Sequence, residues 1–249
     1  MLTAASIMGV MLKGKDDIVT LQIKGDGPLG GVLVTSDSSG NTRGYVHNPF
    51  ADVPGSYEGK LDVASAIGKG TLSVSMDIGL KEPYVGKTEL ISGEIAEDLA
   101  YYYAKSQQTP SSVGLGVLID KDCSVKKAGG FIVQLMPGAS EEFAEKLEEN
   151  IKRMPYITDL FDLGMTPEDI LNIILKDCEY EITDKIPVGY QCNCSRERVE
   201  KALISLGMDE VKDMLEKEGE ADLICNFCNS KYKFDKKDLN QIIDNLGGK

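Results

Sequence analysis

The sequence predicts an α+β protein in three parts, with a β-rich N-terminal domain with packed helices over residues 1–138, a helical linker over 139–190 and a small C-terminal domain over 191–249. Three observations support this organisation. Short β-rich runs separated by glycine-rich turns occupy residues 18–134. Acidic, helix-like patterns follow Pro137 and Gly138, and four of the six cysteines fall within residues 192–228. At 249 residues and 42% hydrophobic composition, the chain can bury a substantial core and divide into domains.

The first domain opens on an apolar run, residues 4–12, which we predict to be a buried helix. This run is far shorter than the roughly 20 residues that a membrane span requires, and Lys13 ends it. Strand character follows in four places: residues 18–23, 31–34, 71–74 and 115–119. The first domain is therefore expected to be mostly sheet.

Residues 25–30 match the pattern G-x-G-x-x-G. A dinucleotide-binding loop of this pattern must open a helix whose N-terminus receives the pyrophosphate. Pro28 and a β-rich run over 32–35 follow instead. We therefore predict a turn between two strands and no nucleotide site.

One helix is predicted inside the first domain, over residues 92–107. Polar residues suited to a helix start are followed by apolar and aromatic residues at helical spacing: Ser92, Glu94, Glu97, Asp98, then Ile95, Leu99, Tyr102, Tyr103. This pattern indicates an amphipathic helix packed on the sheet. Its tyrosines are interpreted as core and rim residues rather than catalytic acids.

The linker carries two predicted helices. Ser140 can cap a helix that runs to about Arg153, and Thr166 can cap a second helix with Pro167 at its first position. Gly164 marks the break before the second helix. Because short helices gain most of their stability from docking, this segment is expected to be marginal and able to detach from its partner.

The paired cysteines are Cys192, Cys194, Cys225 and Cys228, with thirty residues between the pairs. Four thiolates at about 2.3 Å complete the tetrahedral coordination of zinc and leave no open position, so the predicted zinc site is structural and not hydrolytic. Sulfurs this close in sequence can also form two short-range disulfides when an oxidant arrives, and each disulfide removes two ligands. The last part is thus predicted to be a zinc-binding domain that can sense oxidation.

Two alternatives concern the same cysteines. They can be structural zinc ligands with no redox role, although ordinary zinc ribbons have two Cys-x2-Cys pairs about 15 to 20 residues apart and this chain does not. A thioredoxin-like use of Cys225 and Cys228 requires a following helix, whereas residues 231–234 alternate like a strand. A thiol oxidoreductase would also need one cysteine of low pKa beside a cation.

The rest of this domain is predicted to be helical around the cysteines. A helical pattern precedes Gly207, Asp209 can cap the next helix, and Asp235 can cap a final one. So small a domain has a weak core, and zinc can supply about 10 to 16 kcal/mol of apparent folding free energy. Four nearby cations can offset the negative charge of a zinc tetrathiolate or belong to the solvated surface: Arg196, Arg198, Lys231, Lys233.

Charge and cysteine usage restrict the function class. A formal net charge of -13 argues against a nucleic-acid role, because phosphate contacts need a basic face. The chain has six cysteines and no recognisable secretory signal, which points to a reducing compartment, so we expect a cytoplasmic protein. We also expect no membrane segment, since the apolar run at residues 4–12 is too short to span a bilayer. Cys123 and Cys178 lie outside the paired motif and are interpreted as plain thiols, with a secondary redox role as the alternative.

The motif CNCSRERVE at 192–200, followed by CNFC at 225–228, resembles the C-terminal signature of heat shock protein 33, a family of redox-regulated holdase chaperones of bacteria. Further segments resemble the N-terminal domain of that family: residues 22–30, 44–46, 59–63, 92–96, 107–111 and 128–131. The resemblance covers nearly the whole chain. Family members usually carry a further segment before the point that aligns with Met1, so we expect the family's first strands to be missing here.

The resemblance implies an ATP-independent chaperone rather than an enzyme. In the reduced protein the four cysteines would hold one Zn²⁺ and keep the linker docked and the chaperone inactive. Hypochlorous acid, or peroxide with mild heat, would join Cys192 to Cys194 and Cys225 to Cys228, release zinc and unfold the linker. Unfolding client proteins would then bind, and the oxidised chain would form a homodimer. A zinc-ribbon adaptor without redox switching remains the alternative function.

Overall fold

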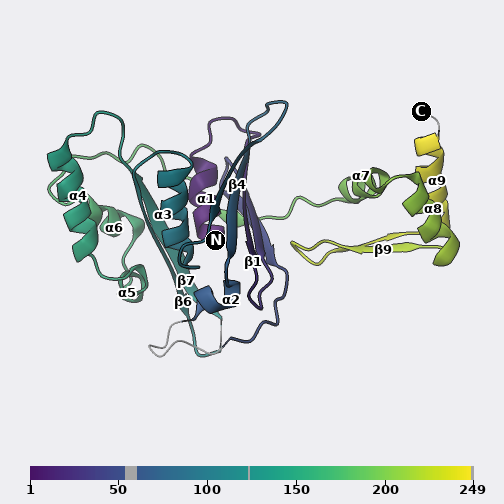
Figure 1. Cartoon of the computed structure of the whole chain (residues 1–249), viewed down its shortest axis with the longest axis horizontal. Helices are drawn as coiled ribbons and strands as arrows, with labels where there is room; N and C mark the ends of the chain where they lie inside the picture. The colour runs from purple at the N-terminus through teal and green to yellow at the C-terminus, as the bar shows by residue number, and fades with distance from the viewer. Residues whose placement is uncertain (54–60, 123, 248–249) are drawn as a thin grey trace. The chain divides into compact units, whose positions relative to one another are not determined.

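The computed structural model describes residues 1–53, 61–122 and 124–247. The chain divides into two compact units, Met1–Tyr190 and Gln191–Lys249. Helices combined with mostly antiparallel sheets confirm the predicted α+β class (Figure 1). The three-part division with boundaries at 138 and 190 stays a prediction.

The first unit is built on a six-stranded sheet of order β5-β4-β1-β2-β3-β8. Figure 1 labels β1 and β4 of this sheet. Its strands are β1 (Ile18–Gly25), β2 (Val32–Asp37), β3 (Asn41–Val46), β4 (Gly70–Asp77), β5 (Tyr84–Glu89) and β8 (Gly189–Tyr190). Strands β1 and β2 pair antiparallel with Ile23 opposite Val32, so residues 25–30 connect two strands of one hairpin. This confirms the predicted turn. Strand β8 differs from the others because it pairs with β3 in parallel.

Two helices lie between this sheet and a second, two-stranded sheet of β6 (Ser111–Ile119) and β7 (Val125–Gln134). Helix α1 (Leu2–Val10) contacts β2 and β7, and α3 (Ile95–Lys105) contacts β4 and β6. A shorter helix, α2 (Val63–Ile67), packs on β1. Gly9 permits the close approach of α1 to β2, since a Cβ there would lie 2.4 Å from Ser36 Oγ. The predicted opening helix is confirmed, with Ala4, Ala5 and Met8 buried.

The start of α3 is held by a buried carboxylate. Asp98 is only 1% exposed, and its oxygens accept hydrogen bonds from the backbone N–H groups of Ile91, Ser92 and Gly93 at 2.7, 3.2 and 3.0 Å. The sequence placed Asp98 at the helix start but gave no reason to expect burial. The carboxylate ties the chain before α3 to its first turn.

Replacing Asp98 with alanine is expected to destabilise the first unit by about 2–3 kcal/mol, because three N–H groups lose their acceptor at a buried site. Glu97→Ala, on the exposed neighbouring residue, is the matched control and should change the stability little. Urea unfolding followed by far-UV circular dichroism measures both. Equal midpoints for the two variants would show that water replaces the carboxylate at no cost.

The linker region forms three short helices beside β6 and β7: α4 (Glu141–Arg153), α5 (Ile157–Asp162) and α6 (Pro167–Ile174). The predicted caps are confirmed, since the Ser140 side chain accepts from Phe143 N and Thr166 forms a capping box with Asp169. Helix α5 was missed. The three helices and β7 share one core of buried residues: Phe131, Leu147, Ile157, Leu160, Ile170 and Ile174.

The described part of the second unit, residues 191–247, contains three helices and one hairpin. These are α7 (Arg196–Leu206), α8 (Met208–Lys217), β9 (Ala221–Ile224), β10 (Lys231–Phe234) and α9 (Lys236–Gly247). Its core is small and consists of Leu203, Val211, Ala221, Phe234, Leu239 and Ile242. Asp235 accepts from the N–H groups at the start of α9, as predicted. The prediction that Asp209 caps α8 is wrong, because Gly207 occupies the cap with φ of 102° and Asp209 lies in the first turn.

Within the described ranges, every helix is too short or too polar to cross a lipid bilayer.

Candidate metal centre

The four paired cysteines come from two short segments of the second unit. Cys192 and Cys194 lie in the irregular chain that leads into α7, where the Ser195 side chain caps the helix by accepting from Arg198 N. Cys225 and Cys228 lie in the turn between β9 and β10. Each segment thus ends in a regular element that holds its cysteines in place.

The turn between β9 and β10 has its own backbone hydrogen bonds. Cys225 N donates to the Ser230 carbonyl at 2.9 Å, and Asn229 N donates to the Cys225 carbonyl at 2.8 Å. Asn229 has a φ of 59°, in the left-handed region that asparagine tolerates better than most residues. This tight turn brings the Cys225 and Cys228 side chains to the same side of the chain.

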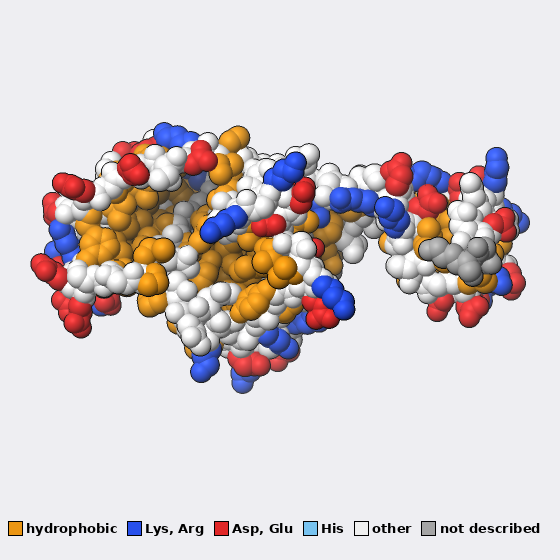
Figure 2. Space-filling model, turned by 90° about the horizontal axis from the view of Figure 1, so that it is seen from above, with side chains coloured by type: hydrophobic (Ala, Val, Ile, Leu, Met, Phe, Trp, Pro, Cys, Tyr) orange, Lys and Arg blue, Asp and Glu red, His pale blue; other side chains and the backbone are white. Residues whose placement is uncertain are grey.

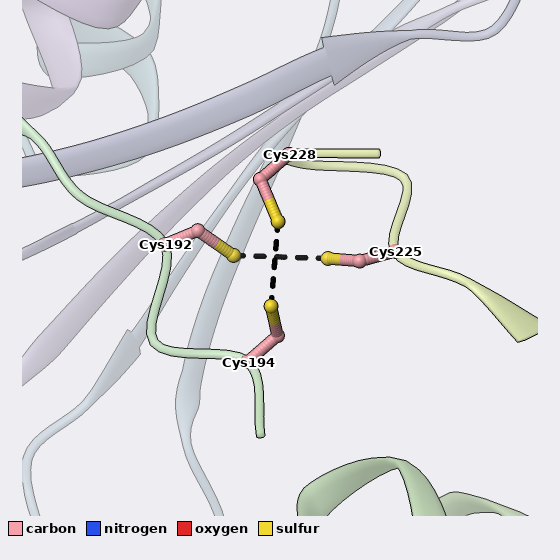
Figure 3. Close-up of side chains that lie close together, drawn as sticks. All are labelled: Cys192, Cys194, Cys225 and Cys228. Carbon is pink, nitrogen blue, oxygen red and sulfur yellow. Dashed lines mark hydrogen bonds between the residues drawn. The ribbon is translucent and has the colours of Figure 1, made fainter. Parts of the chain in front are cut away.

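The four sulfurs converge on a common centre (Figure 3). Cys192 Sγ and Cys225 Sγ are 3.7 Å apart, Cys194 Sγ and Cys228 Sγ are 3.3 Å apart, and all four sulfurs lie within 4.8 Å of one another. A regular tetrahedron with metal–sulfur bonds of about 2.3 Å has sulfur–sulfur edges of about 3.8 Å. A disulfide would need about 2.05 Å. The described arrangement therefore fits four thiolate ligands around one metal ion.

The environments of the sulfurs differ. Burial raises the pKa of Cys192 to about 12, because desolvation disfavours the thiolate. Hydrogen bonding to the side chain and backbone of Ser230 lowers the pKa of Cys228 to about 6. The Ser230 hydroxyl oxygen lies 3.2 Å from Cys228 Sγ. Without a metal, Cys192 would therefore stay a thiol at neutral pH, whereas Cys228 would favour the thiolate.

A tyrosine also reaches the cluster. The Tyr232 hydroxyl donates a hydrogen bond to Cys194 Sγ at 3.0 Å, and this bond raises the pKa of Tyr232 to about 12. In the sequence, Tyr232 is recognisable only as part of the strand-like alternation of residues 231–234. Its contact with Cys194 depends on the packing of β10 against the chain before α7, and no local signal in the sequence specifies that packing.

Two of the four predicted charge-balancing cations have carboxylate partners in this unit. Arg196 donates to the Lys233 carbonyl and to Asp238 at 2.6 Å each, and its guanidinium lies 4.3 Å above the centre of the Phe234 ring. Lys233 pairs with Glu220 at 2.7 Å. These contacts favour the alternative, in which the cations belong to the ordinary surface of the unit. Arg196 also joins the start of α7 to β10 and α9.

The remaining cysteines do not extend the cluster. Cys178 belongs to the first unit, with its sulfur 3.6 Å from the Lys176 carbonyl oxygen. Cys123 lies outside the described residues. Among the residues that the structure covers, the paired cysteines form the one group of histidine, cysteine or acidic side chains close enough to hold a metal ion.

Comparison with known proteins agrees with this geometry. The family model described as "Hsp33 protein" matches residues 1–235. The chain is 50% identical to the 33 kDa chaperonin of Desulforamulus reducens over 98% of this chain and 83% of that protein. It is also 50% identical to the 33 kDa chaperonin of Ruminiclostridium cellulolyticum over 97% of this chain and 82% of that one.

A solved structure is also similar along the whole chain. The crystal structure of the 33 kDa chaperonin (heat shock protein 33 homolog) from Thermotoga maritima matches with a TM-score of 0.89 and 40% identity, covering 100% of this chain and 84% of that one. Family, sequence and fold therefore agree. The chain belongs to the heat shock protein 33 family of chaperones.

Proposed function

We propose that this protein is a redox-regulated, ATP-independent holdase, inactive while reduced and bound to one Zn²⁺, and activated by oxidation to bind unfolding client proteins. The observation that carries the proposal is the convergence of four cysteine sulfurs, at separations suited to a tetrahedral metal site, inside a unit with a small core. Zinc bound there would supply folding free energy and perform no chemistry on a substrate. The proposal assigns no catalytic residue.

Oxidation would convert the ligands into disulfides. Two thiolates give two electrons to one molecule of hypochlorous acid, and the products are one disulfide, one chloride and one hydroxide ion. We propose the pairs Cys192 with Cys194 and Cys225 with Cys228, as the family resemblance implies. Because a disulfide sulfur is a far poorer ligand than a thiolate, two such reactions remove all four ligands.

Loss of the metal would then act on the fold. The second unit keeps only a small apolar core, and α4 to α6 depend on the one core that they share with β7. The proposed sequence of events is unfolding of the second unit followed by detachment of these helices. The first unit already exposes apolar side chains, and part of this surface is visible in Figure 2. Detachment would add the buried faces of α4 to α6 to it.

The proposal extends to partners and location. Clients are unfolding proteins, recognised through exposed apolar side chains rather than through a specific sequence. We further propose that the oxidised chain is a homodimer and that the protein works in the cytoplasm, where a reducing environment keeps the four thiols available to the metal until oxidative stress occurs.

The test combines zinc release with client protection. A chromogenic chelator reports zinc leaving the chain while light scattering follows the aggregation of a heat-unfolding client, before and after hypochlorous acid. We expect zinc loss and new protection to appear together. Zinc that stays bound would favour a zinc-ribbon adaptor without redox switching, and zinc lost without protection would contradict the chaperone switch.

The same oxidised sample decides the disulfide pairing. The two short sulfur contacts, 3.7 and 3.3 Å, run between the cysteine segments and not within them. Peptide mapping by mass spectrometry, with thiols blocked before digestion, should find disulfides within each segment. Disulfides between residues 192 and 225 or between 194 and 228 would contradict the proposed pairing and would leave the second unit cross-linked.

A further inference from the structure

The Tyr232 hydroxyl is aimed at the metal cluster from a segment that supplies no ligand. In β10 the side chains alternate, with Lys231 and Lys233 exposed and Phe234 buried in the core of the second unit. Tyr232 lies on the same face as Phe234 and packs against that core. Its hydroxyl extends beyond the core to Cys194 Sγ, at 3.0 Å.

In the metal-bound form, Tyr232 can only be the donor and Cys194 only the acceptor of this hydrogen bond. A metal-bound cysteine is a thiolate, which carries no proton and can only accept, whereas the tyrosine hydroxyl is protonated at neutral pH and can donate. A hydrogen bond to an ionised acceptor is roughly twice as strong as one between neutral groups. The Tyr232–Cys194 contact is therefore expected to strengthen when the metal binds.

We propose that Tyr232 is a positioning residue of the metal centre, whose hydroxyl holds the Cys194 sulfur in its metal-bound position and withdraws negative charge from it. This inference rests on the proposed zinc-holding role of the four cysteines. Two effects follow. The centre binds metal more tightly because the donor stabilises the ligated thiolate. It also reacts more slowly with oxidants, because a hydrogen-bonded sulfur is a weaker nucleophile.

Tyr232→Phe separates these effects from packing. Phenylalanine keeps the ring that contacts the core and removes only the hydroxyl. Ser205→Ala is a matched control, since it also removes one hydroxyl from the second unit, where Ser205 Oγ donates to the Ala202 carbonyl within α7 at 2.7 Å. Amide hydrogen exchange of the zinc-loaded full chains shows whether each variant folds.

The first measurement is metal affinity of the full reduced chain, by competition with a chelator of known zinc affinity. Tyr232→Phe is expected to bind zinc about tenfold more weakly, in the range that partners of metal ligands usually contribute. Ser205→Ala should match the unmodified chain. Equal affinities for all three chains would overturn the inference but not the proposed function. An unmodified chain that binds no zinc would overturn both.

The absorption spectrum of the Co²⁺-loaded protein tests the effect of the hydroxyl on the sulfur directly. A residue that only supports the fold would leave this spectrum unchanged. Loaded with Co²⁺, the cluster should show thiolate-to-metal charge-transfer absorption, whose energy depends on the electron density of the sulfurs. Loss of the Tyr232 donor raises the energy of the Cys194 lone pairs and should shift this band to longer wavelength. An unchanged band in a folded, cobalt-loaded Tyr232→Phe chain would show that the hydroxyl does not act on the sulfur.

The oxidation effect is measured as the rate of zinc release in hydrogen peroxide. In this reaction two thiolates and one peroxide molecule give one disulfide and two hydroxide ions. Tyr232→Phe should release zinc several-fold faster than the unmodified and Ser205→Ala chains. An equal or slower rate would overturn the part of the inference that concerns oxidation.

Discussion

Removing the metal from the reduced chain is expected to unfold residues 191–249 and to leave the core between the six-stranded sheet and its helices in the first unit folded. The second unit has a core of only six buried hydrophobic residues among those described, and in a domain this small a single hydrophobic core rarely supplies more than about 3–5 kcal/mol. Structural zinc supplies about 10 to 16 kcal/mol of apparent folding free energy, more than such a core can replace. The first unit has its own, larger core between sheet and helices.

Hydrogen exchange read by mass spectrometry measures this outcome for each element. After chelation under reducing conditions, amides of α7, α8 and α9 should exchange at the rate of an unfolded chain, while those of β1 and β4 keep their protection. Cys225→Ser, which removes one ligand, should behave like the chelated protein. Cys178→Ser removes a thiol outside the cluster and should behave like the zinc-loaded protein. Persistent protection of α7 to α9 without metal would show that the core alone suffices.

Local signals in the sequence predicted much of the fold. The caps at Ser140, Thr166 and Asp235 were predictable because each depends on one side chain and the N–H groups two or three residues further on. The hairpin at residues 25–30 was predictable because Pro28 and the following β-rich run exclude a helix. Paired spacing likewise indicated that four sulfurs would meet at one point.

What the sequence did not predict depends on tertiary contacts. Strand β3, with the sequence NTRGYV, has no clear apolar alternation, and it forms because β2 and β8 pair with it on either side. Helix α5 has six residues, too few for a helical pattern, and it is stabilised by the core it shares with β7. The Tyr232 hydroxyl reaches Cys194 only after β10 has packed.

The second large effect is expected from Leu160→Ala. Leu160 is 2% exposed in the core shared by α4, α5, α6 and β7, and truncating a buried leucine costs about 2–5 kcal/mol. A segment of three short helices has little other stability, so the variant should detach these helices in part of the population. Leu163→Ala is the matched control, three residues further on and 78% exposed. Hydrogen exchange of residues 141–174 compares the two variants.

Leu160→Ala is also expected to change chaperone activity, because it weakens the docking of α4 to α6 and leaves the metal site intact. If detachment of α4 to α6 is what makes apolar surface available, Leu160→Ala should suppress client aggregation under reducing conditions, with zinc still bound. Leu163→Ala should need oxidant, as the unmodified chain would. If Leu160→Ala suppresses aggregation with zinc still bound, then α4 to α6 are the elements that cover the client-binding surface. The metal would then act by keeping these helices docked. A Leu160→Ala chain that detaches its helices and still requires oxidant would contradict this, because client binding would then depend on unfolding of the second unit itself.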